Sequence, residues 1–278
     1  MKAKVIGAMA AILLAGWVAG TARADFTLWN DTQMTISGSH APGTLYDRSR
    51  VNVIDGGLVD WLQAEDSSTV DVSGGTVGTA NYGEGIFADH NSTVNISDGW
   101  VRWLYTYGAS AAAISGGEVS RLYTHGTGDV DISGGTVNTL YAQATSAVDI
   151  SGGLVTTLNA EADSTVSISG GKVSFLYAYG TSAAAVSGGS VWRLYAQATS
   201  TVTFDGQDFI LGPGLSLNGD RVLGIGILSG KWFDGTPCTL TISQNDAGAT
   251  ILIVPEPATL SLLALGGLAV IRRRRRRR

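Results

Sequence analysis

The stretch Ser133–Ile150, SGGTVNTLYAQATSAVDI, is one unit of a repeat that fills the middle of the chain. Its pattern, S-G-G-x-V-x-x-L-Y-A-x-x-x-S-x-V-x-I, starts again every 18 residues over most of the region from Ser37 to Asp205. One interval is 24 residues, because the unit that starts at Ser73 carries an insertion at 81–86, around the letters ANYGEG. The first unit is degenerate, as terminal repeats often are.

Apolar and polar residues alternate inside a unit, as in Leu140–Ala142 (LYA) and Val148–Ile150 (VDI). A period of two is typical of β-strands, because successive side chains point to opposite faces. We therefore expect the outer residues of each triplet to point inward and the middle residue outward. The Gly-Gly corners predict tight turns between these short strands.

A single unit cannot fold alone. Burial of about four large apolar side chains contributes roughly 6 to 12 kcal/mol, whereas ordering the backbone of one unit costs on the order of 18 to 36 kcal/mol. Successive units must therefore stack and share hydrogen bonds. We expect an all-β fold, a single-stranded parallel β-helix or β-solenoid of about ten 18-residue coils. Either handedness fits this period.

The segments on both sides of the repeats (37–206) should cover the open sheet edges of the rod. Residues 25–36 are expected to form an N-terminal cap. Residues 207–253 leave the 18-residue register but keep the alternation and the glycine turns, which predicts a β cap or stalk. Cys238, the single cysteine, lies in this segment and is expected to be a small core or edge residue. No intrachain disulfide can form, so stability must come from packing.

The first 24 residues have the form of a signal peptide. Two lysines precede an apolar run, and Ala22-Arg23-Ala24 has the small-x-small form of a signal-peptidase site. The mature protein is therefore expected to begin at Asp25, after cleavage by signal peptidase. An uncleaved N-terminal anchor is the alternative.

The C-terminal segment combines Pro255-Glu256-Pro257, the uncharged 14-residue run Ala258–Ile271 and seven arginines at 272–278. As a helix this run would measure about 21 Å, less than the roughly 30 Å of a bilayer core. It can still span the membrane if the arginines snorkel and the bilayer thins locally. Basic flanks stay on the cytoplasmic side, so the preceding domain should lie outside the cytoplasm.

These three parts, in this order over residues 254–278, resemble the PEP-CTERM domain of exported bacterial proteins. The resemblance implies recognition by an exosortase, a membrane protease or transpeptidase. It also implies delivery to the cell envelope, the cell surface or the extracellular polysaccharide matrix, through a precursor that is transiently anchored in the membrane. A plain C-terminal anchor is the alternative. The resemblance does not indicate what the exported domain does.

The predicted exported segment, 25–254, is strongly acidic. It contains 8 Lys and Arg residues against 22 Asp and Glu residues, a net charge of 8 − 22 = −14. Such a surface repels nucleic acid and anionic lipid, which excludes a nucleic-acid partner. It suits a soluble domain outside the cell, or one neutralised by divalent cations.

One column of the repeat is aromatic. The ninth position of the unit holds Phe87, Tyr105, Tyr123, Tyr141, Tyr177 and Tyr195, and is interrupted by Gln63 and Asn159. Rings on adjacent coils should stabilise one another as cross-strand pairs do. The five tyrosines are also a candidate stripe of ring faces for polysaccharide, since exposed aromatic patches mark contacts.

No catalytic residue, cofactor or metal site is expected. Asp131 and Asp149 should lie about 4.8 Å apart on adjacent coils, near the carboxylate separation of retaining glycosidases. Without the long loops that build a cleft they are expected to be solvated charges, with weak calcium binding or catalysis as alternatives. The three histidines fall at different positions of the unit. The insertion, with Asp89 and His90 after it, is the best place to look for a ligand contact.

Two classes of function remain. We favour a non-catalytic rod with a structural, adhesive or polysaccharide-binding role. The alternative is a polysaccharide lyase or glycoside hydrolase, because parallel β-helices also carry such enzymes, and the fold alone does not choose. An enzyme of that kind should show clustered basic and acidic residues, whereas Arg102, Arg121 and Arg193 are spread along the repeats.

Overall fold

A computed structural model of the protein describes residues 25–79 and 84–254. The predicted signal peptide, residues 255–278 with the Pro-Glu-Pro motif and the predicted membrane-spanning run, and residues 80–83 at the insertion lie outside the described residues. Within the described part, no helix has the length and apolar character needed to cross a membrane.

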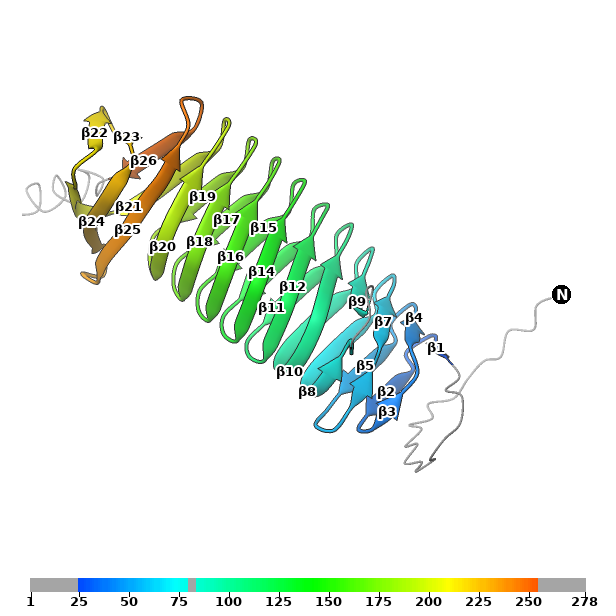
Figure 1. The fold of residues 1–278 in the computed structure, drawn as a ribbon. Coiled ribbons are helices and arrows are strands. Elements are labelled where there is room, and N and C mark those ends of the chain that lie inside the picture. Colours follow the sequence, from blue (N-terminus) through cyan, green and yellow to red (C-terminus); the bar gives the residue numbers. More distant parts are fainter. Residues whose placement is uncertain (1–24, 80–83, 255–278) are drawn as a thin grey trace, which may run out of the picture.

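The repeats form a parallel β-solenoid of about ten coils of about 18 residues, as the period predicts. Figure 1 shows the coils stacked into an elongated rod. Each regular coil contributes one longer and one shorter strand, and each strand pairs in parallel with its equivalent in the next coil. Val119 of one coil pairs with Val137 of the next, so the strand register equals the repeat.

The strands fall into two rows along the rod. The first row, with the longer strands, consists of β1 (Phe26–Leu28), β3 (Ser39–His40), β4 (Gly43–Leu45), β6 (Leu58–Val59), β7 (Trp61–Ala64), β9 (Gly85–Ala88), β12 (Glu118–Thr124), β14 (Thr136–Ala142), β16 (Leu154–Ala160), β18 (Lys172–Ala178) and β20 (Ser190–Ala196). The second row consists of β2 (Gln33–Ile36), β5 (Arg50–Val53), β11 (Ala111–Ile114), β13 (Asp129–Ile132), β15 (Ala147–Ile150), β17 (Thr165–Ile168) and β19 (Ala183–Val186). Two strands, β8 (Thr69–Val77) and β10 (Thr93–Thr106), run through the corner from the second row into the first.

The core is a set of aliphatic columns between the two rows. Leu140 and Ala142 are fully buried, and Val148 and Ile150 are nearly so, whereas Asp149 is exposed. These orientations confirm the prediction from the two-residue period. Equivalent residues of the other coils join them in one continuous core.

The glycine corners are required by the close approach of consecutive coils. Gly153 has φ +70°, in the left-handed region that favours glycine. A Cβ at this position would lie 2.6 Å from the carbonyl oxygen of Gly134 in the preceding coil. The same geometry recurs at each regular corner, which explains the second glycine of the repeated SGG.

The first coils depart from the register that the sequence suggests. Ile36 pairs with Val53, 17 residues on, and Val53 pairs with Val72, 19 residues on, instead of 18 in both cases. The turns between strands absorb this one-residue shift, so the inward columns stay aligned. Strands β1 and β2 pair in parallel with β4 and β5 and therefore continue the stack ahead of the first unit.

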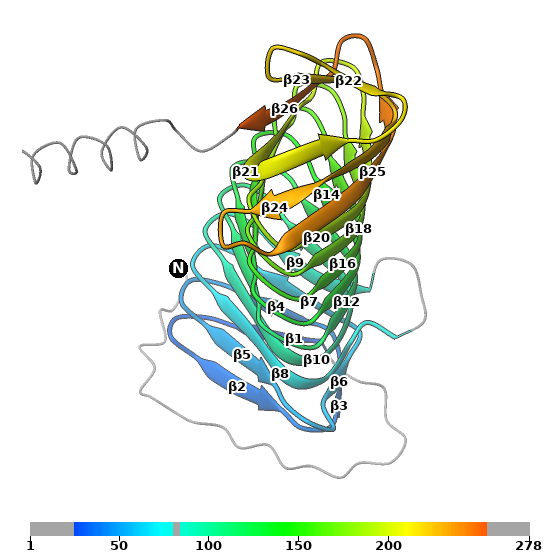
Figure 2. The same ribbon diagram turned by 90° about the vertical axis from the view of Figure 1, so that its left-hand side faces the viewer.

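The last described segment folds back onto the end of the rod (Figure 2). It contains β21 (Thr201–Leu211), β22 (Leu215–Asn218), β23 (Arg221–Gly224), β24 (Gly226–Trp232), β25 (Pro237–Asn245) and β26 (Thr250–Val254). Strands β25 and β26 pair in parallel with β20 and β21, and β24 pairs antiparallel with β21 and β25. Trp232 is buried, and its indole N–H donates to the Gly189 carbonyl oxygen at 2.8 Å. Cys238 is also buried, and burial raises the pKa of its thiol, which suits a core residue better than a nucleophile.

Candidate functional site

The aromatic column forms two runs of stacked rings. Parallel strand pairing places each ring directly beside the ring of the next coil. In the first run, the ring centroids of Phe87, Tyr105, Tyr123 and Tyr141 are separated by 4.9, 4.9 and 4.7 Å, with interplanar angles of 3° to 10°. In the second run, the centroids of Tyr177 and Tyr195 lie 4.5 Å apart at 12°.

The stacking decides which part of each ring can meet a ligand. The centroid spacing is close to the spacing of paired strands, about 4.8 Å, and the planes are nearly parallel. Rings inside a run therefore cover one another's faces, and their edges and hydroxyl groups point outward. This is the ladder that the sequence predicts. The stripe of ring faces for polysaccharide, Tyr105, Tyr123, Tyr141, Tyr177 and Tyr195, stays a prediction, and stacking leaves the ring edges, not the faces, for contact inside a run.

Asn159 separates the two runs. It occupies the ninth position between Tyr141 and Tyr177, and it is only 9% exposed. Its side-chain Nδ2 donates a long hydrogen bond, 3.4 Å, to the carbonyl oxygen of Leu140. Two of the four run ends therefore meet a buried amide.

The N-terminal end of the first run borders a cavity. Among the described residues, this cavity of about 340 Å³ is lined by Trp61, Gln63, Phe87, Asp89 and Tyr107. Gln63 pairs with Phe87 from the preceding coil, and Trp61 pairs with Gly85, which has no side chain. Position 63 holds glutamine where the following coils of the run hold a ring, and the cavity lies at this position.

A polar network lies beside this cavity. The Gln63 side-chain Nε2 donates to Glu65 Oε1, and His90 Nδ1 lies 2.9 Å from Glu65 Oε2. The backbone N–H of His90 donates to Asp89 Oδ1 at 2.7 Å. Glu65, Asp89 and His90 each offer one possible metal-ligand atom, and these three atoms lie within 4.8 Å of one another. The three residues could therefore hold a divalent cation.

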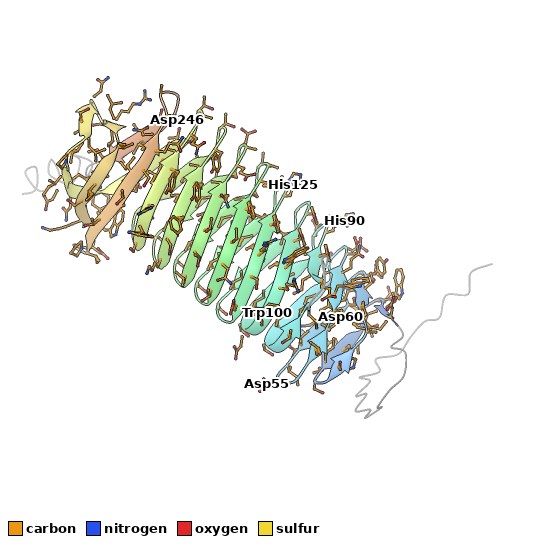
Figure 3. All side chains as sticks on the ribbon, in the orientation of Figure 1. Asp55, Asp60, His90, Trp100, His125 and Asp246 are labelled. Carbon is orange, nitrogen blue, oxygen red and sulfur yellow. The ribbon has the colours of Figure 1, made fainter. Side chains whose placement is uncertain are left out.

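Sequence analysis singled out Asp89 and His90 but not Glu65 or Tyr107. Glu65, Asp89 and Tyr107 share the eleventh position of consecutive units, so alignment of the units by register could have grouped them. The expectation that the histidines would not cluster with metal ligands overlooked carboxylates on the adjacent coil. Figure 3 shows His90 and His125 along the same edge of the rod, with Asp55 at the opposite edge.

Burial shapes the titration of the tyrosines near the cavity. Burial raises the pKa of the Tyr107 phenol, and the nearby carboxylate of Asp89 raises it further. Burial also raises the pKa of Tyr105. Both phenols are therefore neutral hydrogen-bonding groups at ordinary pH.

The acidic pair Asp131 and Asp149 lies on the other row of strands. The two residues pair directly between β13 and β15, as the repeat predicts, and both are exposed. A second cavity, of about 300 Å³, includes Asp149 in its lining together with alanine, serine, threonine and valine residues of neighbouring coils. This surface has small side chains and one carboxylate.

Three arginines, Arg102, Arg121 and Arg193, lie near tryptophan rings. The guanidinium carbons of Arg102 and Arg121 lie 6.0 and 5.8 Å from the ring centroid of Trp103. That of Arg193 lies 4.5 Å from the Trp192 ring. Cation–π contacts of this kind stabilise a surface. Asp131 and Asp149 lie on the other row of strands, so these arginines do not form a cluster with them.

Comparison with known families identifies one segment. Residues 254–277 match the PEP-CTERM protein-sorting motif. The motif implies an exported, cell-envelope-associated protein that is sorted by an exosortase. No curated protein and no solved structure shows significant similarity to the chain.

Proposed function

We propose that the exported domain is a non-catalytic rod of the cell surface or extracellular matrix, with a structural, adhesive or polysaccharide-binding role. The observation that carries this proposal is the unbroken parallel register from β10 to β21, with a filled aliphatic core. A stack of this kind is stiff, because each coil is hydrogen-bonded to both neighbours. The aromatic ladder adds a second line of contacts along the same axis.

The proposed route to the surface has two processing steps. Signal peptidase cleaves after Ala24, so that Asp25 becomes the N-terminus. The apolar run after Pro257 then holds the precursor in the membrane until the exosortase acts near the Pro-Glu-Pro motif. The arginines on the cytoplasmic side fix the orientation.

Residues 207–253 serve as a cap in this proposal, whereas residues 25–36, predicted to be the N-terminal cap, extend the stack through β1 and β2, which pair with β4 and β5. Support comes from the way β25 and β26 pair with β20 and β21, because they occupy edges that would otherwise be open. The buried Trp232 covers apolar surface at the same end. A covered edge prevents end-to-end association of rods.

Several features favour a rod over a polysaccharide lyase or glycoside hydrolase. A catalytic carboxylate pair needs surroundings that set the two pKa values apart, whereas Asp131 and Asp149 are both exposed. The arginines that an enzyme would use for charge stabilisation lie against tryptophan rings.

A depolymerisation assay tests the proposal. The full chain, incubated with neutral and acidic polysaccharides, should release no reducing ends and no unsaturated products above a heat-denatured control. Asp131→Asn is the matched variant, since it removes one charge at an exposed position. Release of oligosaccharides by the wild type, lost in Asp131→Asn, would show that the protein is an enzyme.

A further inference from the structure

The strongest unassigned site is the cavity at the N-terminal end of the aromatic ladder. Phe87 uses one ring face to stack on Tyr105. Its other face is directed to the coil of Gln63, and that coil contributes Gln63 and Trp61 to the cavity lining. Gln63 pairs in register with Phe87 and lies next to that face, so the cavity lies on the outward side of this pair, where Trp61 and Tyr107 complete its lining.

All four run ends meet an amide side chain. Gln63 pairs with Phe87, and Asn159 pairs with both Tyr141 and Tyr177. Tyr195 pairs with Gln244 of β25, whose amide is hydrogen-bonded to Gln197 and Asp246. Phe87 differs from the other end rings in that it lines the 340 Å³ cavity.

We propose that this cavity binds a sugar residue of a neutral polysaccharide. The inference rests on the proposed function and deepens it, because it names the site and the class of glycan. The pyranose ring would pack in the cavity against the outward parts of Phe87, Trp61 and Tyr107, since the apolar C–H face of a sugar packs on aromatic rings. Gln63 and Asp89 would hydrogen-bond its hydroxyl groups.

The size of the cavity suits a small ligand unit. Its volume of about 340 Å³ is at the lower end of the range for binding sites, about 300 to 1,000 Å³. Three aromatic residues and two polar ones match the usual composition of such sites, in which a few polar groups fix the orientation of the ligand. The hydrogen bonds from Gln63 to Glu65 and from His90 to Asp89 hold the polar side in place before binding.

The charge of the site selects against acidic glycans. Asp89 lines the cavity, Glu65 lies beside it, and the predicted exported segment as a whole is strongly acidic. Like charges close together cost free energy, and no arginine or lysine lines the cavity. A uronic acid or a sulfated sugar would therefore be repelled, whereas a neutral hexose or N-acetylhexosamine would not.

Calorimetric titration of the full chain tests the inference. The protein is kept in a zwitterionic detergent, because a detergent with a sugar headgroup would compete with the probes. The probes are cellohexaose, laminarihexaose and chitohexaose, with oligogalacturonate as the acidic comparison. We expect at least one neutral probe to bind and the acidic probe not to bind. Phe87→Leu keeps an apolar side chain but removes the aromatic ring, and should weaken binding about tenfold. Trp192→Leu, at an exposed aromatic position in β20 and outside the cavity lining, should leave the affinity unchanged.

A second variant guards against misfolding of the first. Asp89→Asn keeps the size of the side chain and removes its charge, so it should preserve the melting temperature. It should also lower the affinity for the neutral sugar and reduce the discrimination against oligogalacturonate. Binding that is equal in wild type, Phe87→Leu and Asp89→Asn would overturn the site but leave a polysaccharide-binding rod. If no neutral probe binds, both the site and the polysaccharide-binding role are wrong, and the structural or adhesive role remains. Choline chloride is titrated as an additional probe. If choline binds in the cavity and the sugars do not, the cavity is a cation site and the inference is wrong.

Discussion

Asn159→Tyr should join the two runs of stacked rings into one. The backbone at position 159 pairs in register with Tyr141 on one side and Tyr177 on the other, so a tyrosine there would take the place that its neighbours occupy in their own coils. Neighbouring rings in the runs lie 4.5 to 4.9 Å apart. The new ring would therefore stack on two others.

The expected gain follows from these contacts. Each aromatic pair contributes about 0.5 to 1.5 kcal/mol, so two pairs contribute about 1 to 3 kcal/mol. The substitution removes the hydrogen bond from Asn159 to Leu140, which is long at 3.4 Å and is worth about 0.5 kcal/mol. The free energy of unfolding should rise by about 0.5 to 2.5 kcal/mol. For a domain of this size that corresponds to an increase of roughly 1 to 10 °C in melting temperature.

Thermal unfolding followed by circular dichroism measures the effect. Asn159→Leu is the matched control, because it adds apolar volume without a ring and should gain less than the tyrosine variant. Asn159→Ser removes the amide without adding a contact and should melt at or below the wild-type temperature. A tyrosine variant no more stable than the leucine variant would refute the claim that ring stacking stabilises the rod.

Two further pairs of substitutions test the register and the corners. Leu140→Asp places a charge at a fully buried position and should cost several kcal/mol. Gln143→Asp, at an outward half-buried position, loses one hydrogen bond to Glu161 and should lower the melting temperature much less; equal melting temperatures would contradict the inward register. Gly153→Ala and Gly219→Ala both impose a side chain at positive φ, at about 1 to 2 kcal/mol, but only the Gly153 Cβ collides with the preceding coil. Denaturant unfolding should therefore show a markedly larger loss for Gly153→Ala, and similar losses would mean that the coils are less closely packed than described.

The repeat made much of the fold predictable. Because strands pair coil on coil, the sequence period is also the hydrogen-bond register, and alternation inside the unit then determines which residues are buried. The burial of Leu140 and Val148 follows directly from this alternation. The ladder was predictable for the same reason, since a fixed column must stack on itself in a parallel solenoid.

The local irregularities were not predictable from the period. Pairing of Ile36 with Val53 and of Val53 with Val72 depends on how turns absorb single residues, and a consensus does not encode that. The cavity lies where Gln63 departs from the aromatic column of the following coils. The effect of this missing ring shows only when adjacent coils are in place.

The network around His90 was missed for a related reason. His90 occupies the turn position that has positive φ in most coils, as Ala144 and Ala162 do. Its conformation is therefore a property of the turn, and its contact with Glu65 comes from the coil before it. Motif spacing along the chain does not detect ligands contributed by successive coils.

The central claim is that this chain is the precursor of an exported rod, sorted through its C-terminal motif. Mass spectrometry of the native protein from the envelope and surface material of producing cells tests that claim most directly. The account predicts an N-terminal peptide that begins at Asp25 and a C-terminus near Pro255–Pro257, without the arginine tail. Surface material that retains an intact Arg278 would contradict processing by an exosortase and leave a plain membrane anchor.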